Sequence, residues 1–281
     1  MNMTCEKNNA LRVTIEDDFD LDRIISCGQC FRAKKLLDGS FRFITGGNIL
    51  YITNAGKNSY AISCDEKTWN NTWVPYFSLE TDYRAIRSKS MGLHPFIDQA
   101  ICEGQGLRIL RQEPWEMLLT FIISQRKSIP AIASCVEQIA EQYGTEVVTP
   151  RERIMAFPSP EQMERATLQD LQGYSLGYRS RYVLDAVSCV LSGELQLDKL
   201  SNLDDSQLVD ALLRVKGVGI KVANCVGLFS YGRLGMVPID VWIKKAIYEE
   251  CNGCNPFSQY GKYAGVIQQY VFFYEKSHQR R

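Results

Sequence analysis

Two side chains, Lys221 and Asp240, have the types and positions that chemistry with an amine and a carboxylate would use. Lys221 lies in the first turn of an apolar-periodic segment, where the positive end of a helix disfavours an ammonium ion and so favours the free, nucleophilic amine. Asp240 immediately precedes a second such segment, at a position typical of an N-cap. A rigidly held carboxylate can also stabilise positive charge, so capping and catalysis are compatible. A solvated lysine and a purely structural cap are the alternatives.

Two glycines, Gly217 and Gly219, separate a helix that ends near Lys216 from the helix that carries Lys221. Their spacing predicts a tight hairpin that lets backbone come close to a ligand. The first amide groups of the following helix would then point outward and form a site for a DNA phosphate. An ordinary glycine C-cap between two packed helices is the alternative.

Charge is unevenly distributed along the chain. The formal net charge is +0, which argues mildly against a nucleic-acid partner. Residues 211–248 differ, because six Lys and Arg residues against one Asp give six minus one, or +5. The sequence therefore predicts a local basic surface around the candidate residues.

Cysteine usage and hydropathy indicate the cellular setting. The ten cysteines are scattered and several lie in apolar stretches, which favours reduced, buried thiols over a disulfide framework. The first residues lack the apolar core of a signal peptide, and no run reaches the roughly 18 apolar residues of a membrane span. We therefore expect an intracellular protein without a membrane segment.

The hydrophobic period changes along the chain from strand-like to helical. Residues 30–44 and 48–63 alternate around turn signals at Asp38-Gly39 and Asn54-Ala55-Gly56, which predicts hairpins. From about Leu79 the period is helical, and nine helices are expected. They cover residues 116–124, 129–143, 159–166, 168–171, 179–192, 205–214, 220–231, 241–250 and 263–275. The expected fold is α+β, with an antiparallel β-sheet domain over 1–105 and a mostly helical domain over 106–281.

Several segments, in order, carry a resemblance to a known family. Val215-Lys-Gly-Val-Gly-Ile-Lys221 followed by Val237-Pro-Ile-Asp240 resembles the helix-hairpin-helix–GPD superfamily of DNA glycosylases, and the lysine resembles its bifunctional members. Further segments narrow the resemblance to the 8-oxoguanine DNA glycosylase/lyases. They are Cys27-Gly-Gln-Cys-Phe-Arg32, Tyr76-Phe-Ser-Leu79, Arg108-Ile-Leu-Arg-Gln-Glu-Pro114, Leu176-Gly-Tyr-Arg-Ser-Arg-Tyr182 and Tyr263-Ala-Gly265.

The resemblance implies a base-excision-repair enzyme that flips 8-oxoguanine out of duplex DNA into a cleft in the helical domain. Lys221 would displace the base through a Schiff base and cleave the strand by β-elimination, with Asp240 stabilising the charged sugar. The family further implies four residues that bind the base. They are Cys225 and Phe272 on the two faces of the ring, Gln268 at its pairing edge and the carbonyl group of Gly28 at N7.

The same resemblance implies contacts with double-stranded DNA around the lesion. Tyr178 would act as a wedge and Arg179 would hold the orphaned partner base; a helix-start tyrosine and a solvated arginine are the alternatives. Arg126 would face the opposite base. Lys216, Gly217, Gly219 and Lys244 complete the predicted DNA-binding set. We expect a monomer that needs no metal or cofactor.

Three departures from the family pattern limit the resemblance. Arg126 and Ala131 stand where the animal and yeast branch has an asparagine and an arginine that recognise the opposite cytosine, so selectivity for cytosine is expected to be relaxed. Trp242 replaces a phosphate-contacting histidine. No C-x6-C-x2-C-x5-C pattern follows, which argues against an iron–sulfur cluster. The C-x2-C pairs at Cys27 and Cys251 are too far apart in sequence to favour a zinc site.

Two other functions stay open at this point. A glycosylase for other damaged bases, such as alkylated ones, would not need Lys221, because alkylated bases leave readily. A non-catalytic helix-hairpin-helix DNA-binding module would need the glycines but not Lys221, Asp240 and Phe272 together.

Overall fold

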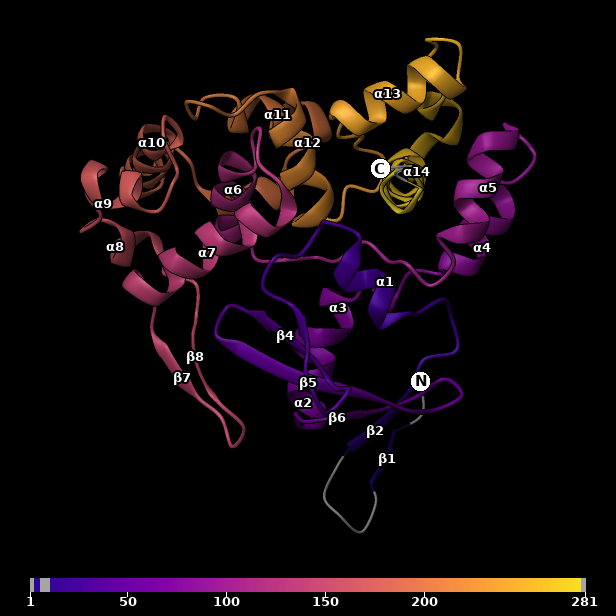
Figure 1. Cartoon of the computed structure of the whole chain (residues 1–281), viewed down its shortest axis with the longest axis horizontal. Helices are drawn as coiled ribbons and strands as arrows, with labels where there is room; N and C mark the ends of the chain where they lie inside the picture. The colour runs from indigo at the N-terminus through magenta and orange to yellow at the C-terminus, as the bar shows by residue number, and fades with distance from the viewer. Residues whose placement is uncertain (1–2, 6–10, 279–281) are drawn as a thin grey trace. The chain divides into compact units, whose positions relative to one another are not determined.

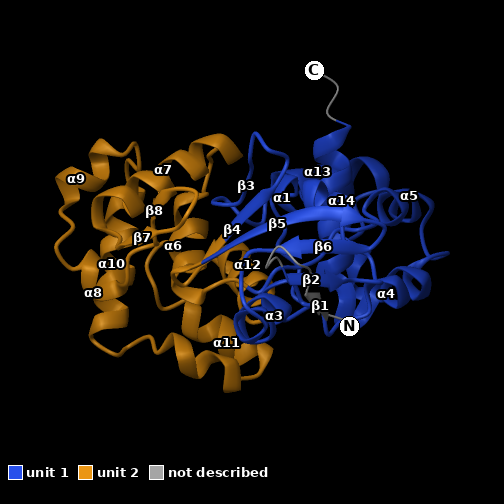
Figure 2. Cartoon of the chain, turned by 90° about the horizontal axis from the view of Figure 1, so that it is seen from below, with its two compact units in different colours: residues 1–43, 49–111, 232–281 blue, residues 44–48, 112–231 orange. Residues whose placement is uncertain are grey.

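A computed structural model describes residues 3–5 and 11–278 of the chain (Figure 1). Backbone contacts divide it into two compact units, which Figure 2 colours blue and orange. The sheet unit comprises residues 1–43, 49–111 and 232–281. The helical unit comprises residues 44–48 and 112–231. No helix among the described residues is long and apolar enough to cross a membrane.

The first part of the chain forms a six-stranded sheet in the order β1-β2-β6-β5-β4-β3. Its strands are β1 (Met3–Cys5), β2 (Leu11–Thr14), β3 (Lys34–Lys35), β4 (Phe41–Thr45), β5 (Asn48–Gly56) and β6 (Ser59–Ile62). The pairs β1–β2, β2–β6, β3–β4 and β5–β6 are antiparallel, with Val13 opposite Tyr60 and Lys35 opposite Phe41. The predicted antiparallel sheet is therefore confirmed.

The position of the first predicted hairpin turn is correct, but that of the second is not. Gly39 has φ +81° between β3 and β4, as the Asp38-Gly39 signal predicts. The second turn comes later than predicted, because β5 continues to Gly56 and the chain reverses at Asn58, with φ +59°. Asparagine tolerates this left-handed conformation better than most residues, so it takes the role expected of Gly56.

A cluster of buried side chains forms the core between the sheet and the helices that follow it. Its members include Phe43, Leu50, Ile52, Trp69, Trp73, Tyr76 and Phe77. Trp69 and Trp73 come from one π-helical turn, η1 (Trp69–Trp73), which lies between the short helices α2 (Glu66–Thr68) and α3 (Val74–Tyr76). This run of aromatic residues anchors the segment on the sheet.

Arg108 ties several segments of the sheet unit together. Its guanidinium is fully buried and bonds to the Asp17 carboxylate at 2.8 Å, which also accepts the backbone N–H groups of Tyr83 and Arg84. The other donors of Arg108 reach the carbonyl groups of Phe77, Asp18, Ser78 and Thr81. A buried cation is tolerated here because all these acceptors surround it.

The remaining helices of the sheet unit come from three stretches of the chain. They are α1 (Leu21–Ser26), α4 (Tyr83–Ser90), α5 (Pro95–Glu103), α13 (Val241–Glu250), η3 (Phe257–Tyr263) and α14 (Ala264–Ser277). Helix α14 packs against α5 and α13, and eight consecutive residues from Ala264 to Val271 are buried. The last helix of the chain is therefore a core element of this unit.

The helical unit is built around α6 (Pro114–Ile123), whose residues from Trp115 to Ile123 are all buried. Around it lie α7 (Ile129–Tyr143), α10 (Arg179–Leu191) and α12 (Ile220–Phe229). The other elements are β7 (Glu146–Val148), β8 (Arg153–Met155), α8 (Pro160–Met163), α9 (Leu168–Gly173), η2 (Leu197–Asn202) and α11 (Asp205–Leu212). The α+β class is confirmed.

The compact units do not coincide with the predicted domains 1–105 and 106–281. The first division falls at 111/112 rather than 105/106, and residues 232–281 group with the sheet instead of with the helices. The physical reason is the packing of α14 on α5 and its hydrogen bonds to the end of α1, which a helical sequence pattern does not reveal.

Candidate active site

A hairpin of residues 213–219 joins α11 to α12 in the helical unit. Gly217 has φ +84°, and a Cβ atom there would lie 2.3 Å from Cδ2 of Tyr182, so this position requires glycine for both conformation and space. Gly219 is the N-cap of α12, with φ −106° and no atom within 4 Å of a Cβ placed on it. Neither backbone strain nor crowding within the protein therefore requires glycine at position 219.

The start of α12 is open to an anion. Gly219 provides no capping side chain, and the first amide groups of a helix have no intrahelical acceptors. Within the hairpin, the Val218 N–H group donates to the Val215 carbonyl at 3.0 Å, and Gln125 Nε2 donates to the Gly217 carbonyl at 2.9 Å. These bonds fix the conformation of the turn that precedes α12.

Lys221, Cys225 and Phe229 lie at successive positions four apart, on one face of α12. The face packs on α6, where the Phe121 ring stacks on Phe229 at 5.5 Å and the Lys221 ammonium lies 5.1 Å from the Phe121 centroid. Lys221 is half-buried and Cys225 is 2% exposed. Lys221 is therefore partly buried and has an aromatic neighbour, and its role as nucleophile stays a prediction.

Residues 124–128, between α6 and α7, carry the predicted opposite-base residue Arg126. It is exposed and has φ +52°, a conformation uncommon for a residue other than glycine. Hydrogen bonds on both sides of Arg126 fix the loop. The Gln125 carbonyl accepts hydrogen bonds from the Arg179 guanidinium, and Lys127 Nζ donates to the Ser175 carbonyl at 2.7 Å. The loop therefore presents Arg126 outward from a well-anchored base.

Tyr178 and Arg179 begin α10 but occupy different surroundings. Tyr178 is 50% exposed, as a wedge residue must be. Arg179 is 7% exposed, lies over the Tyr178 ring and donates to the carbonyl groups of Gln125 and Leu176. The solvated-arginine alternative is thus wrong for Arg179, whose guanidinium links α10 to the 124–128 loop. Lys216 in the hairpin is exposed and paired with Asp185 of α10 at 2.9 Å.

In the sheet unit, Asp240 is the N-cap of α13, as predicted. Its Oδ1 atom accepts the backbone N–H groups of Trp242 at 3.0 Å and Ile243 at 2.9 Å. These bonds place a half-buried carboxylate at the positive end of the helix, which favours its negative charge. Lys244, in the first turn of α13, is exposed.

The other predicted base-binding residues lie on α14 and in the loop after α1, two segments joined by hydrogen bonds. Gly28 has φ +76°, and Gln269 Nε2 donates to the adjacent Cys27 carbonyl at 2.8 Å, which fixes the Gly28 loop on α14. Gln268 is 3% exposed, and its Oε1 atom has no hydrogen-bond partner among the described residues. Phe272 is half-buried one turn later, on the face of Gln268. An unsatisfied buried acceptor beside an aromatic face suits a planar ring with N–H donors.

The structure therefore brings the predicted residues together in two sets. Lys221, Cys225 and the hairpin glycines belong to the helical unit, and Asp240, Lys244, Gly28, Gln268 and Phe272 belong to the sheet unit. The catalytic pairing of Lys221 with Asp240 stays a prediction.

Sequence reasoning missed three residues that support the predicted ones. Phe121 faces Lys221, Gln125 holds the Gly217 carbonyl, and Asp185 holds Lys216. Asp185 could have been found, because it follows Tyr178 and Tyr182 at helical spacing on one face of its helix. Phe121 and Gln125 offered no such signal, since their partners lie about 100 positions away along the chain.

Known proteins resemble the chain over its whole length. A family model described as 8-oxoguanine DNA glycosylase, N-terminal domain, matches residues 10–118. The structure of MBOgg1 in complex with a low-affinity DNA ligand is 33% identical and covers 100% of both chains, with a TM-score of 0.93. The Clostridium acetobutylicum 8-oxoguanine glycosylase/lyase, in complex with DNA containing cytosine opposite 8-oxoguanine, is 30% identical, with a TM-score of 0.93, and the match covers 100% of this chain and 99% of that one. A probable N-glycosylase/DNA lyase of Methanothermobacter thermautotrophicus is 26% identical over 73% of this chain and 72% of its own length.

Proposed function

The chain belongs to the family of 8-oxoguanine DNA glycosylases, and on this premise we propose which of its residues carry out the reaction. It is a bifunctional DNA-repair enzyme, an N-glycosylase with DNA lyase activity, whose substrate is double-stranded DNA containing 8-oxoguanine. It works where the cell keeps its DNA, which is the cytoplasm and nucleoid if the source is a bacterium. We expect it to act as a monomer.

Lys221 is the nucleophile. Its amine attacks C1′ of the damaged nucleotide, and the bond from C1′ to the base breaks, with the electron pair leaving on the base, which takes up a proton. Opening of the sugar ring gives an imine between Lys221 and C1′, and loss of a proton from C2′ then expels the 3′ phosphate. The observation that carries this role is the face of α12, where Lys221 and Cys225 follow an open, two-glycine turn and meet the Phe121 ring.

Asp240 is the carboxylate that stabilises positive charge on the sugar as the base leaves. Two backbone amide groups at the start of α13 hold one of its oxygen atoms, and its side chain is half-buried. A carboxylate fixed in this way needs no reorganisation when charge develops in the transition state.

Recognition of the base falls to four residues. Cys225 and Phe272 offer a polarisable sulfur and an aromatic face for the two sides of the ring. The Oε1 atom of Gln268, which has no partner among the residues that the structure describes, accepts N–H groups of the pairing edge. The Gly28 carbonyl accepts the N7 proton that 8-oxoguanine has and guanine lacks. With guanine, the unprotonated N7 would face the Gly28 carbonyl oxygen. Two acceptors would then lie opposite each other, an unsatisfied contact that costs about 1–3 kcal/mol.

The duplex contacts the open amides of the hairpin and α12 through a phosphate, with Gly217 setting the conformation of the turn and Gly219 allowing close approach. Tyr178 wedges at the lesion, Arg179 holds the 124–128 loop that presents Arg126 to the opposite strand, and Lys244 contributes positive charge. Arg126 projects toward the opposite base, while Ala131 has no side-chain donor. Opposite-base selectivity is therefore relaxed: single-turnover cleavage rates should be comparable with cytosine, thymine or adenine opposite the lesion, whereas a tenfold preference for cytosine would contradict this assignment.

Trapping with borohydride tests the proposed nucleophile. The wild-type protein, mixed with an 8-oxoguanine duplex and sodium borohydride, should form a covalent complex that runs as a shifted band on a denaturing gel. Lys221→Gln should abolish the band while still binding the duplex. Lys199→Gln, which changes an exposed lysine of the same unit, is the matched control and should trap normally. Trapping that survives Lys221→Gln would refute the assignment, and binding without any trapping would favour a non-catalytic module.

A further inference from the structure

One carboxylate on α10, that of Asp185, engages the DNA-binding hairpin through two separate contacts. Its Oδ2 atom accepts the backbone N–H group of Lys216 at 2.9 Å, and its Oδ1 atom pairs with the Lys216 ammonium at 2.9 Å. The Asp185 side chain is 17% exposed, whereas that of Lys216 is 78% exposed. A largely buried acceptor thus holds an otherwise mobile surface lysine at both its main chain and its tip.

Asp185 shares its helix face with two other residues that touch functional parts. Tyr178, Tyr182 and Asp185 are four and three positions apart, so they line one side of α10. The Tyr178 and Tyr182 rings pack edge to face at 5.7 Å, and Tyr182 lies directly against the Cα position of Gly217. One helix face therefore connects the exposed Tyr178 to Gly217 and to the two contacts between Asp185 and Lys216, which together form a clamp on the hairpin.

The charge state of the clamp agrees with its geometry. Burial alone would raise the pKa of the Asp185 carboxyl, but the bonds from Lys216 outweigh burial and hold that pKa below its ordinary value. The same contact raises the pKa of Lys216. Both groups are therefore charged at neutral pH, and the ion pair is intact under the conditions of DNA binding.

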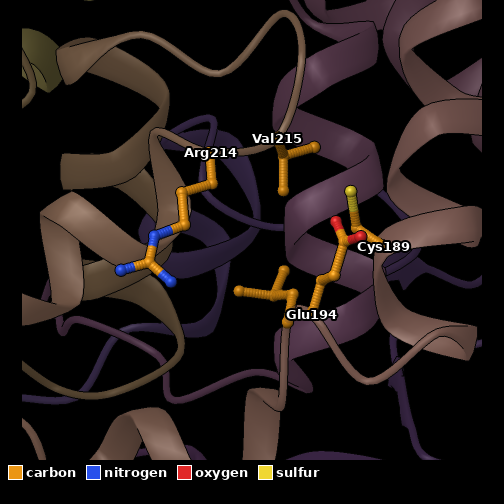
Figure 3. Close-up of a pocket in the computed structure, with 5 residues that line it drawn as sticks. Cys189, Glu194, Arg214 and Val215 are labelled. Carbon is orange, nitrogen blue, oxygen red and sulfur yellow. The ribbon is translucent and has the colours of Figure 1, made fainter.

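A cavity of about 280 Å³, lined by Cys189, Glu194, Leu195, Arg214 and Val215, lies beside the clamp (Figure 3). Cys189 borders this cavity and donates its thiol to Asp185 Oδ2 at 3.8 Å. Figure 3 shows the Arg214 guanidinium turned away from Cys189 and Glu194. The cavity falls below the usual size of ligand pockets, so no ligand is assigned to it.

We propose that Asp185 is a positioning residue for the DNA-binding hairpin, which it fixes through the Lys216 amide while it withholds the Lys216 ammonium from DNA phosphates. The phosphate is then left to the amides at the start of α12. This differs from the sequence-based expectation that Lys216 itself contacts DNA. The inference rests on the proposed DNA contact of the hairpin.

The salt dependence of DNA binding tests this role. The affinity for a labelled, undamaged duplex is measured from low to moderate potassium chloride, since each lysine that neutralises a phosphate adds about 0.9 to the slope of log K against log salt. Asp185→Asn should steepen the slope by about 0.9, because it frees the ammonium. Lys216→Ala should leave the wild-type slope unchanged, and the double variant should match Lys216→Ala.

Two outcomes overturn the proposal. A shallower slope in Lys216→Ala means that this lysine already contacts a phosphate, and an equal steepening by Asp185→Asn with or without Lys216 means that the carboxylate acts through general charge. Glu146→Gln, which removes the carboxylate of an exposed ion pair in the same unit, controls for net charge and should not change the slope. A wild-type protein without salt-dependent binding would instead refute the proposed function.

A comparison of two substitutions at Asp185 tests its hydrogen bond with the Lys216 backbone N–H group. Asparagine can still accept the Lys216 N–H group, but alanine cannot. Asp185→Ala should therefore reduce the single-turnover cleavage rate at saturating enzyme about fivefold more than Asp185→Asn does, the effect of one net hydrogen bond. Equal rates in the two variants would show that this bond does not position the hairpin. Thermal melting confirms that each variant is folded.

Discussion

Gly217 and Gly219 are two positions apart, yet different physical causes require them. Gly217 combines φ +84° with the Tyr182 ring at its Cα, so the protein itself excludes a side chain there. Gly219 has an extended backbone that any residue can adopt, and open space around it. The proposed DNA phosphate at the start of α12 is the group that a side chain at Gly219 would obstruct.

Two alanine substitutions should separate these causes. Gly217→Ala should destabilise the protein by about 1–3 kcal/mol, because it adds a left-handed strain and a clash. Gly219→Ala replaces an N-cap glycine and should lower the melting temperature much less than Gly217→Ala does, while weakening binding to duplex DNA. Calorimetry and fluorescence anisotropy on both variants provide the measurements. A melting temperature lowered equally by both substitutions would contradict the distinction.

Individual site residues were predictable where a local rule applied. The N-cap role of Asp240 follows from its position before an apolar-periodic segment, and the hairpin follows from two glycines. The surroundings of Lys221 were not predictable, because Phe121 is 100 positions away and no local pattern links the two. The buried state of Arg179 was missed for the same reason, since its acceptor, the Gln125 carbonyl, is distant in sequence.

Helices and strands with strong local signals were placed accurately. The predicted ranges 129–143 and 241–250 coincide with α7 and α13, which begin with side-chain caps at Ser128 and Asp240. The β7–β8 hairpin was missed, because strands of three residues are too short to show an alternating pattern. Local capping chemistry therefore fixes boundaries better than hydrophobic period alone.

The cap of α13 allows catalysis and stability to be separated. Asp240→Ala removes the acceptor of two backbone N–H groups and should cost roughly 0.5–2 kcal/mol of stability, together with glycosylase activity. Asp240→Asn keeps a good N-cap but loses the charge, so it should melt near the wild-type temperature and still fail to excise the base. Full activity in Asp240→Asn would show that the charge is not needed.

The division into a sheet unit and a helical unit follows from contacts between distant parts of the chain. Residues 232–281 have a helical hydrophobic period, which predicts that they belong to the helical domain. Their actual grouping depends on packing against α5 and on bonds to residues near the start of the chain. Such tertiary contacts have no signature in hydrophobic period, so only the fold class could be derived.

Acid should weaken the sheet unit through Asp17. Burial alone would raise the pKa of this carboxyl, but the bonds from Arg108 and from the amides of Tyr83 and Arg84 hold it below its ordinary value of 3.8. Because the folded-state pKa is depressed, Asp17 contributes stability above pH 3.8, and this contribution is lost as the pH falls through the depressed value.

Urea unfolding of the wild type and Asp17→Asn from pH 7 to pH 3 measures this contribution. The difference in unfolding free energy should be constant at neutral pH and shrink toward the acidic end. Glu146→Gln serves as the control. It removes the partner of Arg153 in an exposed ion pair that should contribute little to the free energy of unfolding. A difference independent of pH would contradict the role of the Asp17 charge.

The hydrogen bonds from α14 to the end of α1 have a consequence for synthesis of the protein. Gln269 and Lys276 reach the carbonyl groups of Cys27 and Ser26 across 242 and 250 positions. A growing chain leaves the ribosome with its sheet first. The Gly28 loop therefore lacks its hydrogen bonds to α14 until that final helix emerges. A prematurely terminated chain that ends after α13 still carries Lys221 and Asp240 but lacks the helix that braces this loop. Completion of translation is thus a precondition for shaping the loop.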